Sequence, residues 1–274
     1  MKKLIVFILF ISSTSFLSAQ SGWEAGGWLG AAHYFGDLNT NYKIDDPGIA
    51  LGAFARYNFN NRLAFKLGAN FGVISGDDAD SDNTFERNRN LHFRSNIVDG
   101  LGQLEFNFLP YNHGSNDDFF TPYLFAGIAV YNYNPKAELD GEWVELAPLG
   151  TEGQFRGEEY FTLKGGMVYG GGLKISLSYE WSIEFELSSR YLFNDYLDDV
   201  STVYPDIDDL ESLRGPVAVA LSDRSVELVP DVLDEAIGEP GKQRGNSNDN
   251  DFYAMFGVSV VYYFGGINCP KVSY

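Results

Sequence analysis

The feature that most constrains this fold is a pair of alternating segments on either side of Glu180. In the second segment, 181–194, one parity is apolar (Trp181, Ile183, Phe185, Leu187, Tyr191 and Phe193), and the other carries Glu184, Glu186 and Arg190. Side chains of a strand alternate between faces, so the segment predicts a strand with one apolar and one charged face. The preceding segment, 167–179, alternates in the same way. A turn of about two residues joins them, which predicts an antiparallel hairpin over 169–194.

Eight segments of this kind are spaced along the chain. They cover 23–34, 48–59, 62–74, 92–109, 122–133, the two halves of the 169–194 hairpin, and 252–264. They are longer than the strands of globular proteins, which usually have about 5–6 residues. Long strands, apolar outer faces and an even strand number are typical of bacterial outer-membrane proteins. The sequence therefore predicts an all-β fold: an eight-stranded antiparallel transmembrane β-barrel with up-and-down topology.

The connections support this topology because short and long ones alternate. Three long loops are expected at about 75–91, 134–163 and 195–251, with shorter turns between them. Outer-membrane barrels have short periplasmic turns and long extracellular loops. We therefore expect the long loops outside the cell, and both chain ends, including the tail 265–274, in the periplasm. Residues 20–274 then form a single barrel domain.

Charged residues on the inward parity distinguish this barrel from a soluble sandwich or a lipocalin-like barrel, which would alternate similarly. An eight-stranded barrel is narrow enough for side chains to fill it, so opposite charges can pair inside. The expected lumen charge network consists of Arg56, Lys66, Glu105, Lys174, Glu184, Glu186 and Arg190.

One segment, 92–109, breaks its own alternation. Phe93, Ile97 and Leu101 have one parity, whereas Leu104 and Phe106 have the other. An extra residue in a strand shifts the parity of everything after it. We therefore expect a β-bulge near residues 100–102, where two glycines flank Leu101.

The first 19 residues predict a secretory signal peptide, in which Lys2 and Lys3 precede an apolar run and small residues end at Ala19. The full chain has a formal charge of −19, and removal of these two lysines makes it −21. A strongly acidic surface repels nucleic acid, so we expect no DNA or RNA partner. A single cysteine, Cys269, excludes an internal disulfide.

Motifs that would carry chemistry are weak. His33 and His92, the latter close to Ser95, lack the recognisable nucleophile and oriented base of an outer-membrane lipid hydrolase or acyltransferase. The acidic stretch 77–83 lacks the glycine and glutamate that an EF-hand requires, which leaves a solvated loop or a loose surface calcium site. We expect no enzyme activity and no catalytic, cofactor-binding or metal-binding residues. The loop 195–251 is either functional or disordered, and residues 217–237 within it suggest a short helix.

Both ends of the mature chain resemble a known family. Glu24 with its following glycines, the element Tyr34–Asn39, and a last strand that ends in Phe264–Gly266 before Cys269–Pro270 are similar to PorG-type outer-membrane proteins of Bacteroidota. The resemblance implies a component of the type IX secretion system, associated with a periplasmic ring built from a lipoprotein and its partner. The residues expected to dock such partners are Cys269, Pro270, Gly36 and Asp37, with the turn 110–121 and the tail 265–274 as further contacts.

The main hypothesis is a non-enzymatic scaffold that contacts outer-membrane lipids and docks the ring lipoprotein and associated secretion proteins. A filled lumen of eight strands is too narrow to pass folded protein, so the chain is not itself the channel. The alternative is a stand-alone small barrel similar to OmpW or OmpX that acts in adhesion, stress resistance or small-solute permeation. A minor alternative is a lipid-modifying enzyme. In an oxidising periplasm, Cys269 is either free or paired with another chain by a disulfide.

Overall fold

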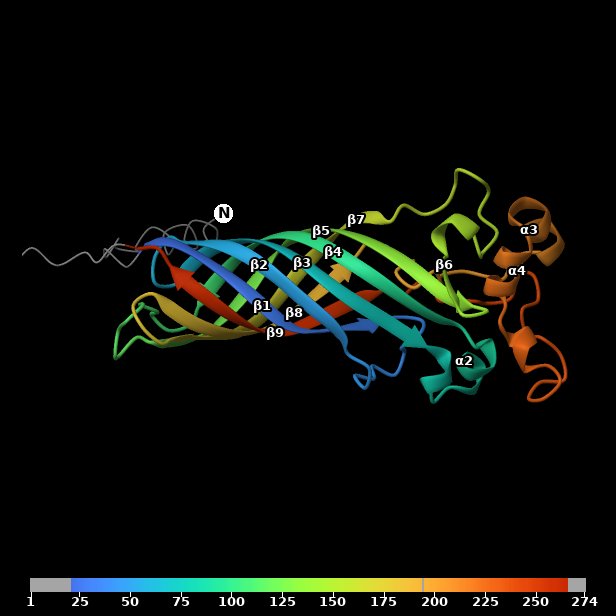
Figure 1. Cartoon of the computed structure of the whole chain (residues 1–274), viewed down its shortest axis with the longest axis horizontal. Coiled ribbons are helices and arrows are strands. Elements are labelled where there is room, and N and C mark those ends of the chain that lie inside the picture. The colour runs from blue at the N-terminus through green and yellow to red at the C-terminus, as the bar shows by residue number, and fades with distance from the viewer. Residues whose placement is uncertain (1–20, 194, 266–274) are drawn as a thin grey trace, which may run out of the picture.

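The chain folds into a closed antiparallel barrel of eight long strands (Figure 1). The computed structural model describes residues 21–193 and 195–265. The barrel strands are β1 (Gly22–Phe35), β2 (Gly48–Asn58), β3 (Leu63–Asp77), β4 (His92–Asn107), β5 (Phe120–Leu139), β7 (Leu163–Ser176), β8 (Trp181–Leu192) and β9 (Phe252–Tyr263). These strands pair in chain order, and the pairing of β9 with β1 closes the barrel. The fold class predicted from the sequence is confirmed.

The short elements all lie at one end of the barrel, which we call the loop end (Figure 1). They are η1 (Asp78–Asp80), α2 (Thr84–Arg89), β6 (Glu142–Glu145), η2 (Ala147–Leu149), α3 (Ile207–Arg214), α4 (Pro216–Ser222) and η3 (Ser225–Leu228). The opposite end, the turn end, holds the start of β1, the end of β9 and the three shorter connections. Among the described residues, no helix is both long and apolar enough to cross a membrane.

The loops expected at 75–91 and 134–163 begin later than expected because their strands continue. β3 extends to Asp77 and β5 to Leu139, where a tight turn leads into β6. The loop expected at 195–251 contains two α-helices and a 3-10 turn, so it is built as ordered structure.

Outward-facing side chains form an apolar belt around the barrel. Every barrel strand contributes, and the residues Leu29, Leu51, Leu67, Leu104, Ile128, Met167, Leu187 and Val258 are between 40% and 71% exposed. Aromatic pairs border the belt at the turn end, where Trp23 contacts Tyr57 and Trp181 contacts Tyr262. An apolar band flanked by aromatic rings is the surface that transmembrane barrels present to lipid.

The bulge predicted near residues 100–102 is wrong. β4 keeps one continuous register with β3, in which Gly100 faces Ala69 and Leu101 faces Gly68. Buried and more exposed residues alternate along the whole of β4. Phe93, Ile97 and Leu101 point inward because the lumen itself changes from charged to apolar along the barrel axis.

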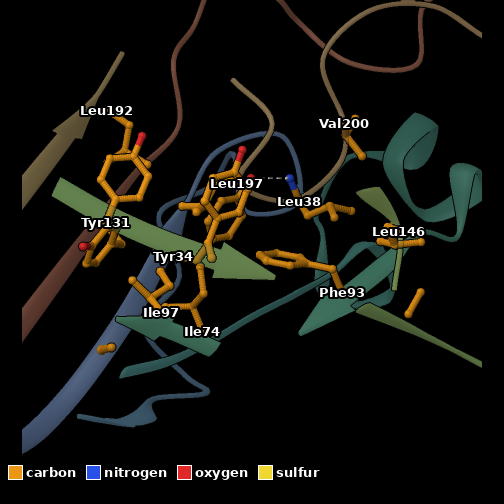
Figure 2. Close-up of a cluster of buried hydrophobic side chains, with 14 of the residues drawn as sticks. Tyr34, Leu38, Ile74, Phe93, Ile97, Tyr131, Leu146, Leu192, Leu197 and Val200 are labelled. Atoms are coloured by element: carbon orange, nitrogen blue, oxygen red, sulfur yellow. Dashed lines mark hydrogen bonds between the residues drawn. The ribbon is translucent and has the colours of Figure 1, made fainter. Parts of the chain in front are cut away.

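The loop-end half of the lumen is filled by an apolar core. Figure 2 shows Tyr34, Phe93 and Tyr131 from the barrel strands in one cluster with Leu197 and Val200, which follow β8. Each of these five residues is at most 2% exposed. Because strands and loops share one packed core, the loop end is a continuation of the barrel fold.

We expect Ile128→Arg to weaken folding into a bilayer, because a cation at the middle of the belt must leave water. In transmembrane barrels this change costs about 2–4 kcal/mol at the midplane and about 0–1 kcal/mol near the interface. The matched control is Asn132→Arg, on the same strand and face but closer to the loop end. Denaturant titration of refolding into lipid vesicles measures the free energy of folding of both variants. Equal losses of stability in the two would contradict a lipid-facing belt.

Candidate functional site

Arg56 of β2 is the centre of an ion-pair network in the turn-end half of the lumen. Its guanidinium nitrogens lie 2.6 Å from Glu24, 2.9 Å from Glu105 and 2.5 Å from Glu184. These four side chains are almost completely buried and come from four different strands. A planar guanidinium donates in several directions, so one arginine can satisfy three carboxylates.

Two lysines extend this network. Lys66 lies 2.5 Å from Glu186, and Lys174 lies 2.6 Å from Glu105. A weaker contact of 3.8 Å joins Lys66 to Glu105 and so links the two pairs. The hydroxyl of Tyr123 donates to Glu186 at 2.7 Å. Six of the seven residues predicted for the lumen network are therefore brought together.

The seventh, Arg190, belongs to a separate cluster nearer the loop end. Its Nε donates to Asp99 at 3.1 Å. Asp99 also accepts from the amide of Asn70 at 2.5 Å and from the hydroxyl of Tyr253 at 3.0 Å. Its carboxylate therefore satisfies donors from three other strands, which fixes the point where the charged lumen meets the apolar core.

The connection between β4 and β5 folds back into the turn end of the lumen. Tyr111 and His113 are buried there. His113 Nε2 lies 2.8 Å from Glu24, and its ring stacks on Tyr263 with centroids 4.5 Å apart. These rings fill the turn end of the barrel. Of the turn proposed to dock partners, the exposed part includes Gly114, Asn116 and Asp117.

Sequence reasoning missed Glu24, Asp99 and His113 as members of the lumen network. Glu24 and Asp99 lie at inward positions of their strands, so the alternation rule that found the other residues could also have found these two. His113 lies in a turn, where no periodic pattern indicates direction.

At the loop end, residues 36–47, 78–91, 140–162 and 195–251 pack into a layer that we call the cap. Two buried arginines join its segments. Arg89 contacts both carboxylate oxygens of Asp78, at 2.8 and 2.7 Å, and donates to the carbonyl oxygens of Asp37 and Arg244. Arg244 pairs with Glu152 at 3.1 Å. Because each arginine bridges segments that are distant in sequence, the cap is a single folded unit.

Four aspartates lie where the cap meets the barrel: Asp37, Asp195, Asp198 and Asp251. The hydroxyl of Tyr34 lies 2.5 Å from Asp198 and 3.0 Å from Asp251. Burial raises the pKa of both carboxyls well above the ordinary value. Burial also raises the pKa of Asp195 to about 7 and that of Asp37 to about 6, with neighbouring carboxylates adding to the effect. Folding of the cap therefore favours the protonated form of these carboxyls.

Of the four residues proposed to dock periplasmic partners, the structure describes two. Gly36 and Asp37 lie in the cap, where Asp37 accepts hydrogen bonds from the backbone N–H of Asn246. Cys269 and Pro270 lie outside the described residues.

The candidate histidines do not form a hydrolase arrangement within 21–193 and 195–265. His33 faces outward beside Phe35. His92 contacts Arg224 and Trp143, whereas the hydroxyl of Ser95 accepts from the backbone of Asn134. The same ranges contain no cluster of histidine, cysteine and acidic residues suited to a metal ion. In the acidic stretch 77–83, Asp77 caps the turn η1 and Asp78 is held by Arg89.

A cavity of about 660 Å³ opens at the edge of the cap. Its walls are the connection between β1 and β2, the loop-end parts of β3 and β4, the region of η1 and α2, and Trp143 of β6. A concave site of this size is large enough for a small molecule or part of a polymer.

The family described as "Domain of unknown function (DUF6089)" matches residues 2–217. Among proteins with curated functions, none matches the sequence. Similar solved structures include Ail of Yersinia pestis in complex with the heparin analogue sucrose octasulfate (9% identity, 89% of this chain and 99% of that chain, TM-score 0.42). Another is Neisserial surface protein A, with 10% identity over 90% of this chain and 99% of that chain and a TM-score of 0.44. A third is the outer-membrane protein OprG from Pseudomonas aeruginosa, with 10% identity over 90% of this chain and 99% of that chain and a TM-score of 0.41.

We expect Arg56→Ala to destabilise the barrel strongly, because it leaves Glu24, Glu105 and Glu184 buried without their shared partner. Removal of one member of a buried ion pair costs about 3–5 kcal/mol. Lys136→Ala is the control, since the side chains of the pair Lys136–Glu145 are 33% and 50% exposed and surface pairs contribute about 0–1 kcal/mol. The free energy of unfolding in vesicles measures both. A loss for Arg56→Ala no larger than for Lys136→Ala would contradict the central role of Arg56.

We expect the cap to be more stable at pH 5 than at pH 8. Burial raises the pKa of Asp195 from 3.8 to about 7, so the folded cap binds a proton that the unfolded chain releases. That stability is complete below the unfolded pKa and is lost as the pH rises through about 7. Hydrogen exchange at the N–H groups of Leu197 and Val200, corrected for the intrinsic rate, measures the cap opening.

The variant Asp195→Asn tests this assignment, because an amide can accept the hydrogen bond from Ser201 without carrying a charge. It should slow exchange at pH 8 and flatten the pH dependence. Asp234→Asn, an exposed change in the same loop, should leave the profile unaltered. An unchanged profile in Asp195→Asn would refute the role of this carboxyl.

Proposed function

Because the chain belongs to the DUF6089 family, whose description assigns no activity, we propose a function from its own geometry. We propose that it is a non-enzymatic outer-membrane barrel with a filled lumen, which binds ligands at the cell surface through its loop end. In this proposal the turn end and both chain ends face the periplasm. This corresponds to the stand-alone small barrel considered above, acting in adhesion or surface recognition.

The observation that carries the proposal is the ordered cap. Long loops of a barrel are free to be disordered, because the strands alone satisfy the backbone in the membrane. Here Arg89 and Arg244 are buried among the loops, and an apolar core continues from the barrel into them. Ordering loops costs conformational entropy, so a rigid cap supports a role in presenting a defined surface.

The filled lumen argues against permeation as the main activity. The network around Arg56 crosses the turn-end half, and the cluster around Tyr131 fills the loop-end half. Rings of Tyr111 and His113 occupy the turn end. A solute would have to displace buried ion pairs and packed aromatic rings, and both changes are costly.

A scaffold role in type IX secretion is the second candidate, supported by the resemblance at the element Tyr34–Asn39 and at the end of the chain. Its contacts with periplasmic proteins would come from the exposed part of the turn 110–121 and the tail that contains Cys269. Recovery of a periplasmic ring lipoprotein in a mild-detergent pull-down, lost in Cys269→Ser or on tail deletion, would favour this role over surface binding.

We expect the purified protein to give no stable conductance in planar bilayers, because ion pairs and rings fill its lumen. A porin inserted in the same membranes is the positive control. The inserted barrel is verified separately by protease protection of its transmembrane part. A reproducible single-channel conductance from the wild-type chain would contradict the filled-lumen proposal and favour solute permeation.

A further inference from the structure

We propose that the cavity at the edge of the cap binds an uncharged saccharide. This inference deepens the proposed function, on which it rests for placing the cavity at the cell surface. The cavity of about 660 Å³ is lined mostly by polar and charged side chains. Small-molecule sites of this size are usually lined predominantly by apolar groups, so this one favours a ligand covered with hydroxyl groups.

Several lining side chains have hydrogen-bonding capacity to spare. Asn41, Asp45 and Arg94 are exposed and line the cavity. Within the described part of the chain, their side chains make no hydrogen bond or ion pair with another residue. An amide, a carboxylate and a guanidinium together offer donors and acceptors in planar groups. Such groups match vicinal hydroxyls, each of which both donates and accepts.

Trp143 supplies an apolar surface beside these polar groups. It is 45% exposed although it lines the cavity. Its position is fixed, since β6 pairs with β5 and the ring of His92 contacts the indole at 83°. His92 is itself held by Arg224 and by the backbone N–H of Glu138. An exposed, fixed indole can pack against the C–H face of a sugar ring while the polar groups bind its hydroxyls.

The walls are organised before any ligand arrives. Glu86 of α2 accepts hydrogen bonds from Thr40 and Ser81. Asn39 binds the backbone of Lys43 on both sides, through its amide nitrogen and its amide oxygen. These contacts tie the connection between β1 and β2 to the region around α2. A site held in this way loses little conformational entropy on binding. This helps it to bind a polar ligand whose individual contacts are weak.

Charge argues against an anionic ligand. The cavity is lined by five carboxylates, Asp45, Asp46, Asp77, Asp80 and Glu86, against two permanent cations, Lys43 and Arg94. Burial and the nearby Arg224 lower the pKa of the third basic group, His92, which disfavours its charged form. The whole chain adds a formal charge of −19. Sulfated or phosphorylated ligands would be repelled, whereas an uncharged saccharide would not.

The experiment uses the refolded mature chain in a zwitterionic detergent without sugar groups. Isothermal titration follows the addition of maltotetraose, mannotetraose and chitotetraose as uncharged probes, and of a heparin tetrasaccharide as an anionic probe. We expect saturable binding of at least one uncharged probe and none of heparin. Trp143→Ala should weaken that binding about tenfold through loss of stacking. Phe155→Ala, which removes a more exposed aromatic ring (63% against 45% for Trp143) in the same cap segment but outside the cavity, should leave it unchanged.

A second arm separates a soluble glycan from a lipid headgroup. Acrylamide quenching of Trp143 is compared in nanodiscs with and without a neutral hexosyl lipid, using Trp143→Phe to isolate its signal. Protection by the glycolipid without binding of soluble probes would identify a headgroup as the source. Binding of soluble probes without such protection would identify a free glycan, and both results support the site.

The proposal is overturned if the folded chain binds neither the soluble probes nor the glycolipid. It is also overturned if heparin is preferred, or if Trp143→Ala binds like the wild-type chain. Urea titration of the same samples verifies that each variant is folded. Membrane insertion, measured separately by vesicle flotation, distinguishes a failure of this site from a failure of the proposed outer-membrane role.

Discussion

The barrel depends on burying Arg56 together with Glu24, Glu105 and Glu184. Successive side chains of a strand point to opposite faces of the barrel wall. When one set forms the apolar belt outside, the other set must therefore lie in the lumen. Burial of an isolated charge costs several kcal/mol, and only a partner of opposite sign compensates. The narrow lumen brings residues of non-adjacent strands within 2.9 Å of one guanidinium. Closure of the barrel and pairing of its charges therefore require each other.

The polarity of the barrel wall reverses along its axis. At the turn end of β4, Leu104 and Phe106 face outward, while Glu105 faces the lumen. At the loop end of the same strand, Arg94 faces outward and Phe93 faces the core. A wall in lipid needs an apolar outside, whereas a wall in water needs an apolar inside. The strands therefore continue beyond the membrane as an ordinary soluble barrel, with the apolar core inside and the cap packed on top.

This reversal explains how far sequence reasoning could go. Alternation is local, so it located all eight strands and the inward parity of Arg56 and Lys174. The same rule failed at residues 100–102, since a change of environment along a regular strand looks like a bulge when only parity is read. The cap was beyond reach because it depends on pairs such as Arg244 with Glu152, whose partners are 92 residues apart. No local pattern encodes a contact of that kind.

The two ends of the barrel differ in what they leave available to a ligand. At the turn end, Tyr111 and His113 of the connection between β4 and β5 are buried in the lumen, so they offer no surface to a ligand. At the loop end, the apolar core and the buried arginines fill the interior of the cap. Trp143, Asn41 and Arg94 line the cavity at its edge and remain accessible. Around the cavity, carboxylates outnumber cations, which disfavours a polyanion but imposes no electrostatic penalty on a neutral ligand. The free side chains of the cavity are therefore matched to a ligand that brings hydroxyls rather than charge.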